Sequence, residues 1–340
     1  MLLASALRAR GVQVRVAALY AGGPREQELA SAGVPVWLGG VPRKWQVWRL
    51  LAALWRLFRL MRRERPDVVH AFLFHAYVIA GPLARLARVP VTVAGRRSLG
   101  SFLDGRPLLR LLGRWSNHAY DAVVANAQAV ADDTLRREGL APAAVHVIPN
   151  ALPDEAFATG ATAHRWAEPV QLLCVGNLIA YKGHSNLLAA LAQLRSPVHL
   201  DIAGEGPERD RLQLAAEQRG LDVSLLGARR DVAVLLQSAD VFVLPSLEEG
   251  MSNALMEAMA AGLPIVATDV GGNREVLGDT GVLCRAGDPA DLARTLQGLL
   301  DDPEGARAMG CTARRRAEER FRVDAFAEAH VTLYRRLLEA

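Results

Sequence analysis

Short apolar runs rich in β-branched residues alternate with longer stretches of helical periodicity from one end of the chain to the other. Runs such as Val198–Ala203 are typical of buried strands, whereas the stretches between them repeat their apolar residues about every 3.6 positions, which predicts helices. This alternation predicts parallel sheets covered by helices on both faces. The predicted strands form two series, over residues 12–19, 34–38, 67–73, 91–94, 122–125 and 145–148, and then 171–175, 198–203, 223–226, 241–244, 265–268 and 281–283.

Two series of strands predict two doubly wound α/β domains, which suits a length of 340 residues because one domain usually holds about 150. Prolines and a glycine punctuate residues 149–168, where no apolar period is seen, so the domain boundary is expected there. We expect residues 1–153 to form the first domain and residues 154–322 the second. Three helices are predicted near the end of the chain, over residues 288–301, 303–320 and 323–339.

The first ten residues predict the last turns of a helix that ends at Gly11. A doubly wound domain normally opens with a strand and a glycine-rich turn, and that strand is central in the sheet. Without it, two strand edges inside the sheet would lack partners. We therefore hypothesise that the natural start lies upstream, and a stop codon directly before Met1 would contradict this idea.

Composition excludes several classes of protein. Apolar residues make up 51% of the chain, which excludes a disordered protein. No apolar run reaches about 18 residues and no secretory leader is recognisable, so neither a transmembrane helix nor a signal peptide is predicted. Cys174, Cys284 and Cys311 are scattered, without CxxC spacing, and are expected to be buried thiols in a reducing cytoplasm rather than disulfides or metal ligands.

The basic residues point to one position. The net charge of +4 and the isoelectric point of about 9.2 are only mildly basic, which argues against a dedicated nucleic-acid binder. Of 40 basic residues, only Lys44 and Lys182 are lysines. A lysine kept in an arginine-rich chain indicates a position that needs a compact ammonium group, so Lys182 is a candidate for an anion contact.

Residues 245–257 follow a predicted strand and open a predicted helix. Gly250 allows a sharp turn and close approach of a ligand, and Ser252 or Asn253 can cap the helix. The free amides and positive dipole end of such a helix form an anion site at the carboxyl end of a strand. Glu249 would lie at the edge of that site and Glu257 inside the helix. The alternative is a capped helix with two solvated glutamates.

Residues 175–184 also link a predicted strand to a helix. Gly176 and Gly183 permit close backbone approach, and Lys182 would direct a flexible cation at an anion bound there. The alternative is an exposed lysine in a turn.

These segments belong to a longer series of motifs that resembles the family 4 retaining glycosyltransferases. The resemblance is strong over residues 165–290 and weaker over most of the rest. No single motif is decisive, but six in this order are highly specific. They are Gly176 with Lys182-Gly-His184, Ala203-Gly-Glu-Gly-Pro207, Leu226-Gly with Arg230-Asp-Val232, Asp240–Ser246, Glu249-Gly with Glu257–Pro264, and Val270-Gly-Gly with Glu275.

The resemblance implies a GT-B fold, in which two Rossmann-like domains face a cleft and the last helix, residues 323–340, packs back on the first domain. It implies a retaining, metal-independent transfer of a sugar from a nucleotide diphosphate donor, with uridine as the default base, and no cofactor. No Asp-x-Asp pair lies near either motif. The implied acceptor is a glycan or lipid-linked glycan in the assembly of bacterial surface polysaccharide or lipopolysaccharide.

The resemblance also implies roles for individual residues. Lys182 matches the cation on the donor diphosphate, Glu257 the acid on the ribose hydroxyls, and Glu249 part of the sugar site. We expect Lys182 and Glu249 to be the catalytic pair, because fixed positive charge stabilises the leaving diphosphate. The full set of expected donor-binding residues is Gly176, Asn177, Lys182, Arg229, Arg230, Glu249, Gly250, Met251, Ser252, Asn253 and Glu257.

Two departures from the family pattern concern ligand contacts. Asn177 stands where many members carry an arginine, so one diphosphate cation is missing or comes from elsewhere. Arg96 and Arg97 stand near the position of a common histidine, and either is a candidate for contact with the sugar or phosphate. His70 and His75 flank the end of a predicted strand, where a structural role and an acceptor contact are both open.

Residues 43–65 predict an amphipathic helix of unusual composition. Trp48 and Trp55 lie in a broad apolar arc, and arginines share one narrow side of the helical wheel. One interpretation is a core helix with its arginines in solvent. The other is partial insertion into an anionic membrane surface, at the inner face of the membrane, which would suit an enzyme whose acceptor is a lipid-linked glycan. The arginines are Arg49, Arg56, Arg59 and Arg63.

Two rival functions are open at this point. One is a nucleotide-sugar epimerase on the same fold, although the glutamates and Lys182 follow the transferase pattern. The other is a non-catalytic partner that binds a nucleotide sugar but lacks a working acceptor side.

Overall fold

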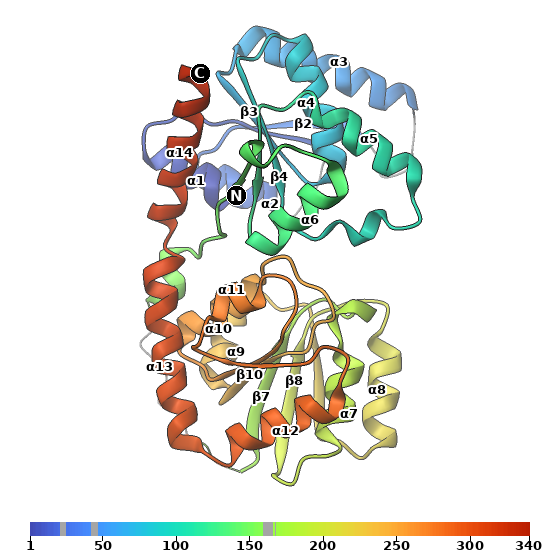
Figure 1. The fold of residues 1–340 in the computed structure, drawn as a ribbon, viewed down its shortest axis with the longest axis vertical. Coiled ribbons are helices and arrows are strands. Elements are labelled where there is room, and N and C mark those ends of the chain that lie inside the picture. Colours follow the sequence, from blue (N-terminus) through green and yellow to red (C-terminus); the bar gives the residue numbers. More distant parts are fainter. Residues whose placement is uncertain (21–24, 42–46, 159–165, 167) are drawn as a thin grey trace. The chain divides into compact units, whose positions relative to one another are not determined.

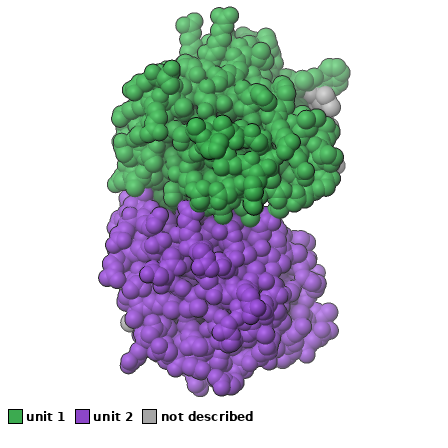
Figure 2. Space-filling view, viewed as in Figure 1, with its two compact units in different colours: residues 1–151, 323–340 green, residues 152–322 purple. Residues whose placement is uncertain are grey.

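The computed structural model describes residues 1–20, 25–41, 47–158, 166 and 168–340. The chain divides into two compact units, which Figure 2 shows in different colours. Unit 1 comprises Met1–Ala151 with Val323–Ala340, and unit 2 comprises Leu152–Arg322. The predicted boundary lay after residue 153, and residues 159–165 and 167 of the predicted linker lie outside the described residues.

Unit 2 is built on one parallel sheet of six strands, and all six were predicted to within a residue or so. The order across the sheet is β12-β11-β10-β7-β8-β9, so the direction of strand addition reverses between β7 and β10. The strands are β7 Val170–Val175, β8 Val198–Ala203, β9 Val223–Gly227, β10 Val241–Leu244, β11 Ile265–Thr268 and β12 Val282–Cys284.

Helices cover the sheet of unit 2, and their boundaries follow the capping residues. Ser252, Asp288 and Asp302 each accept a backbone N–H at a helix start, which satisfies an amide that the helix itself leaves free. The helices are α7 His184–Leu191, α8 Arg209–Gln218, α9 Val232–Ser238, α10 Asn253–Ala261, α11 Asn273–Leu277, α12 Pro289–Leu300 and α13 Pro303–Arg320.

Unit 1 contains two parallel sheets instead of one. β1 and β2 form a pair, and β3, β4, β5 and β6 form a second sheet in that order. Among the described residues, β1 and β3 each have a partner on one side only. The strands are β1 Val16–Tyr20, β2 Val36–Val41, β3 Val68–Phe72, β4 Val91–Arg96, β5 Ala122–Ala125 and β6 Val145–Val147.

The helices of unit 1 lie on two faces of these sheets (Figure 1). On one face α3, α4 and α5 follow one another, with α4 packed against both neighbours. On the other face α14 packs against α1 and β4. Because strand side chains alternate, Ala94 joins the core under α4, and Val93 joins the core under α14. The helices are α1 Leu2–Ala9, α2 Arg25–Ser31, α3 Val47–Glu64, α4 Phe74–Leu86, α5 Pro107–Asn117, α6 Gln128–Glu138 and α14 Val323–Glu339.

Candidate functional site

The two residues predicted to be catalytic meet at the carboxyl ends of β7 and β10. Lys182 follows β7 and Glu249 follows β10, and these neighbouring strands flank the point where the strand order reverses. In open α/β sheets, ligands bind at this point, because the loops of the two strands diverge there and leave a crevice. The fold of unit 2 therefore places the predicted pair at its expected ligand position.

Lys182 and Glu249 form a largely buried ion pair. Lys182 Nζ lies 2.5 Å from Glu249 Oε1, and the two side chains are 18% and 8% exposed. Ser246 Oγ donates a second hydrogen bond to the same carboxylate oxygen, at 2.8 Å. A buried charge must be paired and hydrogen-bonded to be tolerated, and both conditions are met here.

Glycines bring the loops of this site into close contact. Gly183 has φ +71°, and a Cβ atom there would lie 1.9 Å from the carbonyl oxygen of Pro245. Gly271 has φ +51°, and a Cβ atom there would lie 1.7 Å from the carbonyl oxygen of Glu249. Only glycine fits either position, both for its backbone angle and for the space available. These contacts fix the loops that carry Lys182 and Glu249.

The start of α10 lies directly after Glu249. Ser252 caps the helix by accepting from the amide of Leu255 at 3.3 Å, and the helix ends at Gly262 in the left-handed conformation, as predicted. Met251 is buried and Asn253, the first helical residue, is exposed. Gly250 accepts a hydrogen bond from the amide of Gly272 at 2.9 Å. The positive end of the α10 dipole is thereby held beside the ion pair.

Glu257 lies within α10 and is half-buried. Burial raises the pKa of its carboxyl group. A carboxyl group that is costly to bury without a partner is suited to accept hydrogen bonds from ligand hydroxyl groups.

Gly176 and Asn177 form the turn after β7. The nearest atom to a Cβ on Gly176 would be Lys182 Cδ, at 3.8 Å, so the turn runs alongside the lysine stem. The side chain of Asn177 is exposed, and its backbone carbonyl lies 3.1 Å from His184 Nε2. His184 is buried, which lowers its pKa, although the Asn177 carbonyl opposes this shift. His184 therefore shapes the turn as a neutral side chain.

Arg229 and Arg230 follow β9, at the edge of the sheet, and both are exposed. Arg229 Nε donates to Asp231 at 2.8 Å. The structure brings Lys182, Glu249 and the start of α10 together, but shows no contact between the arginines and this group within the described part of the chain.

Sequence reasoning missed a set of buried polar residues behind Glu249. Asn273 Nδ2 donates to the carbonyl of Thr268 at 2.9 Å, and Thr268 Oγ1 donates to the carbonyl of Ser246 at 2.5 Å. Ser246 then reaches Glu249, and the three side chains are at most 2% exposed. The available signal was a hydroxyl residue at the end of a buried apolar strand, as Thr268 is, or two positions after it, as Ser246 is.

The candidate residues in unit 1 have structural partners. Arg96 is buried, lies 2.8 Å from Glu138 Oε2, donates to Asn117 at 2.8 Å, and stacks 3.6 Å from the centre of the Tyr77 ring. These contacts hold Arg96 in the interior, so the hypothesis of a ligand contact is not supported for it. Arg97 donates to Asn150.

His70 is also interior. Its Nδ1 lies 2.7 Å from the hydroxyl of Tyr334 on α14. Burial, His330 and Arg97 all lower the pKa of His70 well below its usual value. His75 is exposed. The structure thus favours the structural role for His70.

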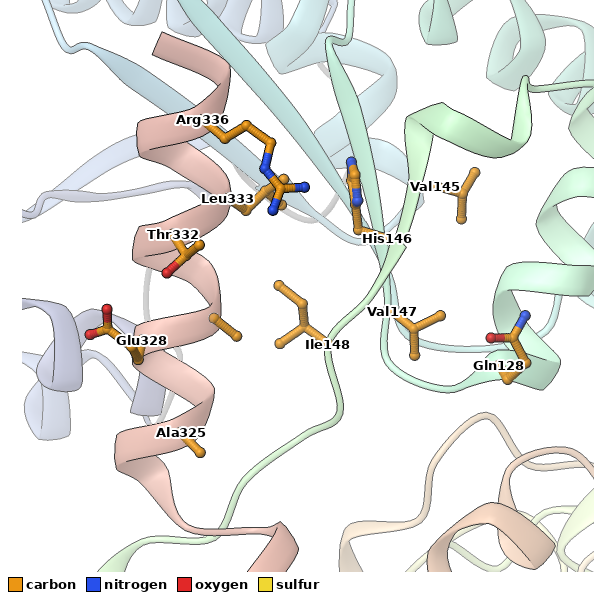
Figure 3. A pocket seen from close by; sticks show the side chains of 11 residues that line it. Gln128, Val145, His146, Val147, Ile148, Ala325, Glu328, Thr332, Leu333 and Arg336 are labelled. Atoms are coloured by element: carbon orange, nitrogen blue, oxygen red, sulfur yellow. The ribbon is translucent and has the colours of Figure 1, made fainter. Parts of the chain in front are cut away.

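Unit 1 also carries an open groove of about 700 Å³ between β6 and α14. In Figure 3, Val145 to Ile148 line one side and residues of α14, from Ala325 to Arg336, line the other. None of the predicted site residues lines it.

Within the described ranges, no helix is both long enough and apolar enough to span a bilayer. The same residues contain no group of three or more His, Cys, Asp or Glu side chains placed to hold a metal ion.

Comparison with known proteins decides the family. Residues 1–156 match the family described as Glycosyltransferase Family 4, and residues 169–302 match Glycosyl transferases group 1. A glycogen synthase of Mycobacterium tuberculosis is 33% identical over 293 residues, which cover 80% of this chain and 69% of that protein. The chain belongs to the family 4 glycosyltransferases. It is therefore an enzyme of the glycosyltransferase class, as the motifs predicted.

Two further proteins are similar to this glycosyltransferase, one in sequence and one in fold. The 2-deoxystreptamine glucosyltransferase of Streptomyces kanamyceticus is 28% identical, over 86% of this chain and 83% of its own length. HepE of Anabaena, solved with UDP and glucose, has a TM-score of 0.87 at 22% identity, covering 98% of this chain and 94% of its own. The similarity to HepE confirms the GT-B fold.

Proposed function

We propose that this glycosyltransferase moves a sugar from a UDP-sugar to a glycan or lipid-linked glycan, with retention of anomeric configuration and without a metal ion. The Lys182–Glu249 ion pair beside the start of α10 carries the proposal, because a cation, a carboxylate and the positive end of the α10 dipole lie together at the carboxyl ends of neighbouring strands. The UDP and glucose bound to HepE, and the glycan product of a glycogen synthase, support the donor and acceptor classes.

Donor binding would replace the Lys182–Glu249 contact with contacts to the donor. Its diphosphate takes Lys182 Nζ and the amides at the start of α10, and this releases Glu249 to accept from the sugar hydroxyls. Glu257 holds the ribose hydroxyls, and the backbone near Arg229 and Arg230 reads the base. Gly176 and Asn177 leave room for the phosphates.

In the reaction, the bond between the anomeric carbon and the phosphate oxygen breaks, and a bond from the acceptor oxygen to the same face of that carbon forms. The acceptor proton passes to the leaving phosphate oxygen. Negative charge grows on the diphosphate, where Lys182 and the helix amides stabilise it from fixed positions. These groups supply the charge compensation that a metal ion provides in other enzymes.

The proposed setting is the cytoplasmic face of the membrane, in the assembly of bacterial surface polysaccharide or lipopolysaccharide. The segment 43–65 supports it, because the described part of this segment, on α3, exposes Trp48 and Trp55 beside arginines. Its residues 43–46 lie outside the described residues.

Calorimetric titration with UDP and with GDP tests the donor site. We expect UDP to bind, and Lys182→Ala to weaken binding between about tenfold and about a hundredfold, since hydrogen bonds to charged groups contribute about 1.5 to 3 kcal/mol. Arg195→Ala removes an exposed cation of unit 2, paired with Asp301, and is the matched control with unchanged affinity. Equal affinity of the Lys182→Ala variant and the wild type would overturn the site, and preference for GDP would correct the base.

A further inference from the structure

Helix α5 is amphipathic with its apolar side turned toward solvent. Leu108, Leu111, Leu112 and Trp115 follow the spacing i, i+3, i+4, i+7 that normally marks the core side of a helix. Here Leu108, Leu111 and Trp115 are 68%, 64% and 60% exposed. The buried side of the helix is instead made by Gly113, Ser116 and Asn117.

Helix α3 shares this property over its first half. Trp48, Leu51 and Trp55 are exposed, Trp48 by 82% of its surface. The core side of α3 is supplied by Leu57 and Met61, which pack under it with residues of α4. The solvent side of α3 therefore begins with tryptophans and ends with arginines.

The exposed apolar residues of α3 and α5 belong to one surface. Both helices pack against α4, and the three lie in sequence on the same face of the sheet (Figure 1). Helices in one layer turn their outer sides in the same general direction, and α4 adds Leu86, which is 70% exposed. We name the outer side of α3, α4 and α5 the three-helix face. Several large exposed apolar side chains on adjacent helices mark an interaction site.

The charge of the three-helix face indicates an anionic partner. The three helices carry eight arginines and one glutamate, and two of these arginines, Arg85 and Arg110, pair with Asp121 and Asp104 beside the helices, so positive charge remains in excess. Within the described part of the chain, Arg49, Arg59 and Arg63 form no ion pair with an acidic residue. The cores of protein interfaces are depleted in charged residues, and a second copy would oppose like charges. Tryptophan, leucine and arginine together suit the interface of an anionic bilayer.

We propose that the three-helix face docks on an anionic membrane, with Trp48, Trp55 and Trp115 in the headgroup region and α5 contributing as much as α3. The acceptor is then an amphiphile held in that membrane, and this second statement rests on the proposed function. The docking extends the membrane setting of the proposed function from α3 to α5, and it can be tested without donor or catalysis.

Vesicle co-sedimentation tests the docking with the full chain. Vesicles of phosphatidylcholine are compared with vesicles that also contain phosphatidylglycerol, at low and at high salt. We expect binding only to the anionic vesicles, with loss of binding at high salt. Replacing Leu108, Leu111 and Trp115 by Ser should weaken binding at least about tenfold, since apolar side chains in the headgroup region supply much of the membrane affinity. Trp48→Ser with Trp55→Ser should act similarly.

The matched control replaces exposed apolar residues away from the face. Leu214 and Val234, on α8 and α9, are 54% and 59% exposed, and Leu214→Ser with Val234→Ser should bind vesicles like the wild type. Circular dichroism and UDP titration of every variant show whether the fold and the donor site are retained, so failure of docking is distinguishable from failure of the proposed function.

Three outcomes would overturn the proposal. The first is no binding of the wild type to anionic vesicles. The second is an α3 variant that loses vesicle binding while the α5 variant binds like the wild type. That result would assign the membrane contact to α3 alone. The third is a wild-type dimer that the α5 variant converts to a monomer without any effect on vesicle binding.

Discussion

The two units use their polar and apolar residues in opposite ways. In unit 2 buried polar groups converge on the proposed ligand position, where Lys182, Glu249 and Ser246 meet at the ends of β7 and β10. In unit 1 buried polar groups satisfy one another, as Arg96 and Glu138 do, and apolar side chains of α3 and α5 face solvent. A site that binds one particular ligand requires a defined backbone geometry in its loops. A docking surface requires only that the exposed side chains be apolar or charged.

The largest expected effect comes from comparing two glycines with nearly the same φ angle. Gly183 in unit 2 has φ +71° and Gly139 in unit 1 has φ +69°, but only Gly183 lacks room for a Cβ atom. We expect Gly139→Ala to cost about 1 to 2 kcal/mol, the ordinary penalty of the left-handed region, and Gly183→Ala to cost more than about 3 kcal/mol. Hydrogen exchange of peptides from each unit measures the two costs separately, and equal costs would contradict the contrast.

A second test uses acid. His330 is buried on α14, and burial lowers its pKa to about 4, against the opposing effect of the Phe326 carbonyl and with help from the charge of Arg97. Because its pKa is lower in the folded state, the stability that it confers is complete above about pH 6.5 and is lost as the pH falls toward 4. His330 alone should cost unit 1 about 2 kcal/mol at pH 5, and the lowered pKa of His70 acts in the same direction.

Unit 2 should respond less to the same change of pH. Burial lowers the pKa of His184, whereas hydrogen bonds to Asp222 and Asp201 outweigh burial and raise the pKa of His199, so their contributions oppose each other. Hydrogen exchange at pH 7.5 and pH 5, corrected for intrinsic rates, should show unit 1 opening first. His330→Phe should reduce the difference, and acid sensitivity that is equal in both units would contradict the prediction.

The smallest expected effect sharpens the boundary of the donor site. Arg229→Ala removes an exposed ion pair with Asp231, and exposed pairs contribute little to stability. If only the backbone of this loop reads the base, melting temperature and UDP affinity should change little, by a few-fold at most in affinity. Calorimetry would reveal a large loss of affinity if the guanidinium itself contacts the donor.

The sequence predicted the strands well because buried parallel strands are short, continuous apolar runs with little competing interpretation. It predicted Lys182 and Glu249 as a pair because glycines and a helix start mark the loops that hold them, and the structure brings the two side chains together. It did not identify Ser246 or Thr268, whose contacts depend on which strands become neighbours. Arg96 was a candidate for ligand contact because its partner Glu138 is distant in sequence, and only the fold brings them together.

The orientation of α5 was beyond prediction for a different reason. Periodicity shows that a helix has an apolar side, but the pattern is identical whether that side faces the core or the solvent. Which side of α5 is buried depends on how well each side packs. The buried side is made by Gly113, Ser116 and Asn117.

The Lys182–Glu249 ion pair has a consequence for competition inside a cell, where free phosphate and other small anions are abundant. A lysine already neutralised by a carboxylate attracts such anions weakly, because a competitor must strand a buried Glu249 to take its place. Only a molecule that brings both an anionic group for the lysine and hydroxyl groups for the glutamate resolves both charges at once. We therefore expect the ion pair to disfavour molecules that carry only the anionic group or only the hydroxyl groups.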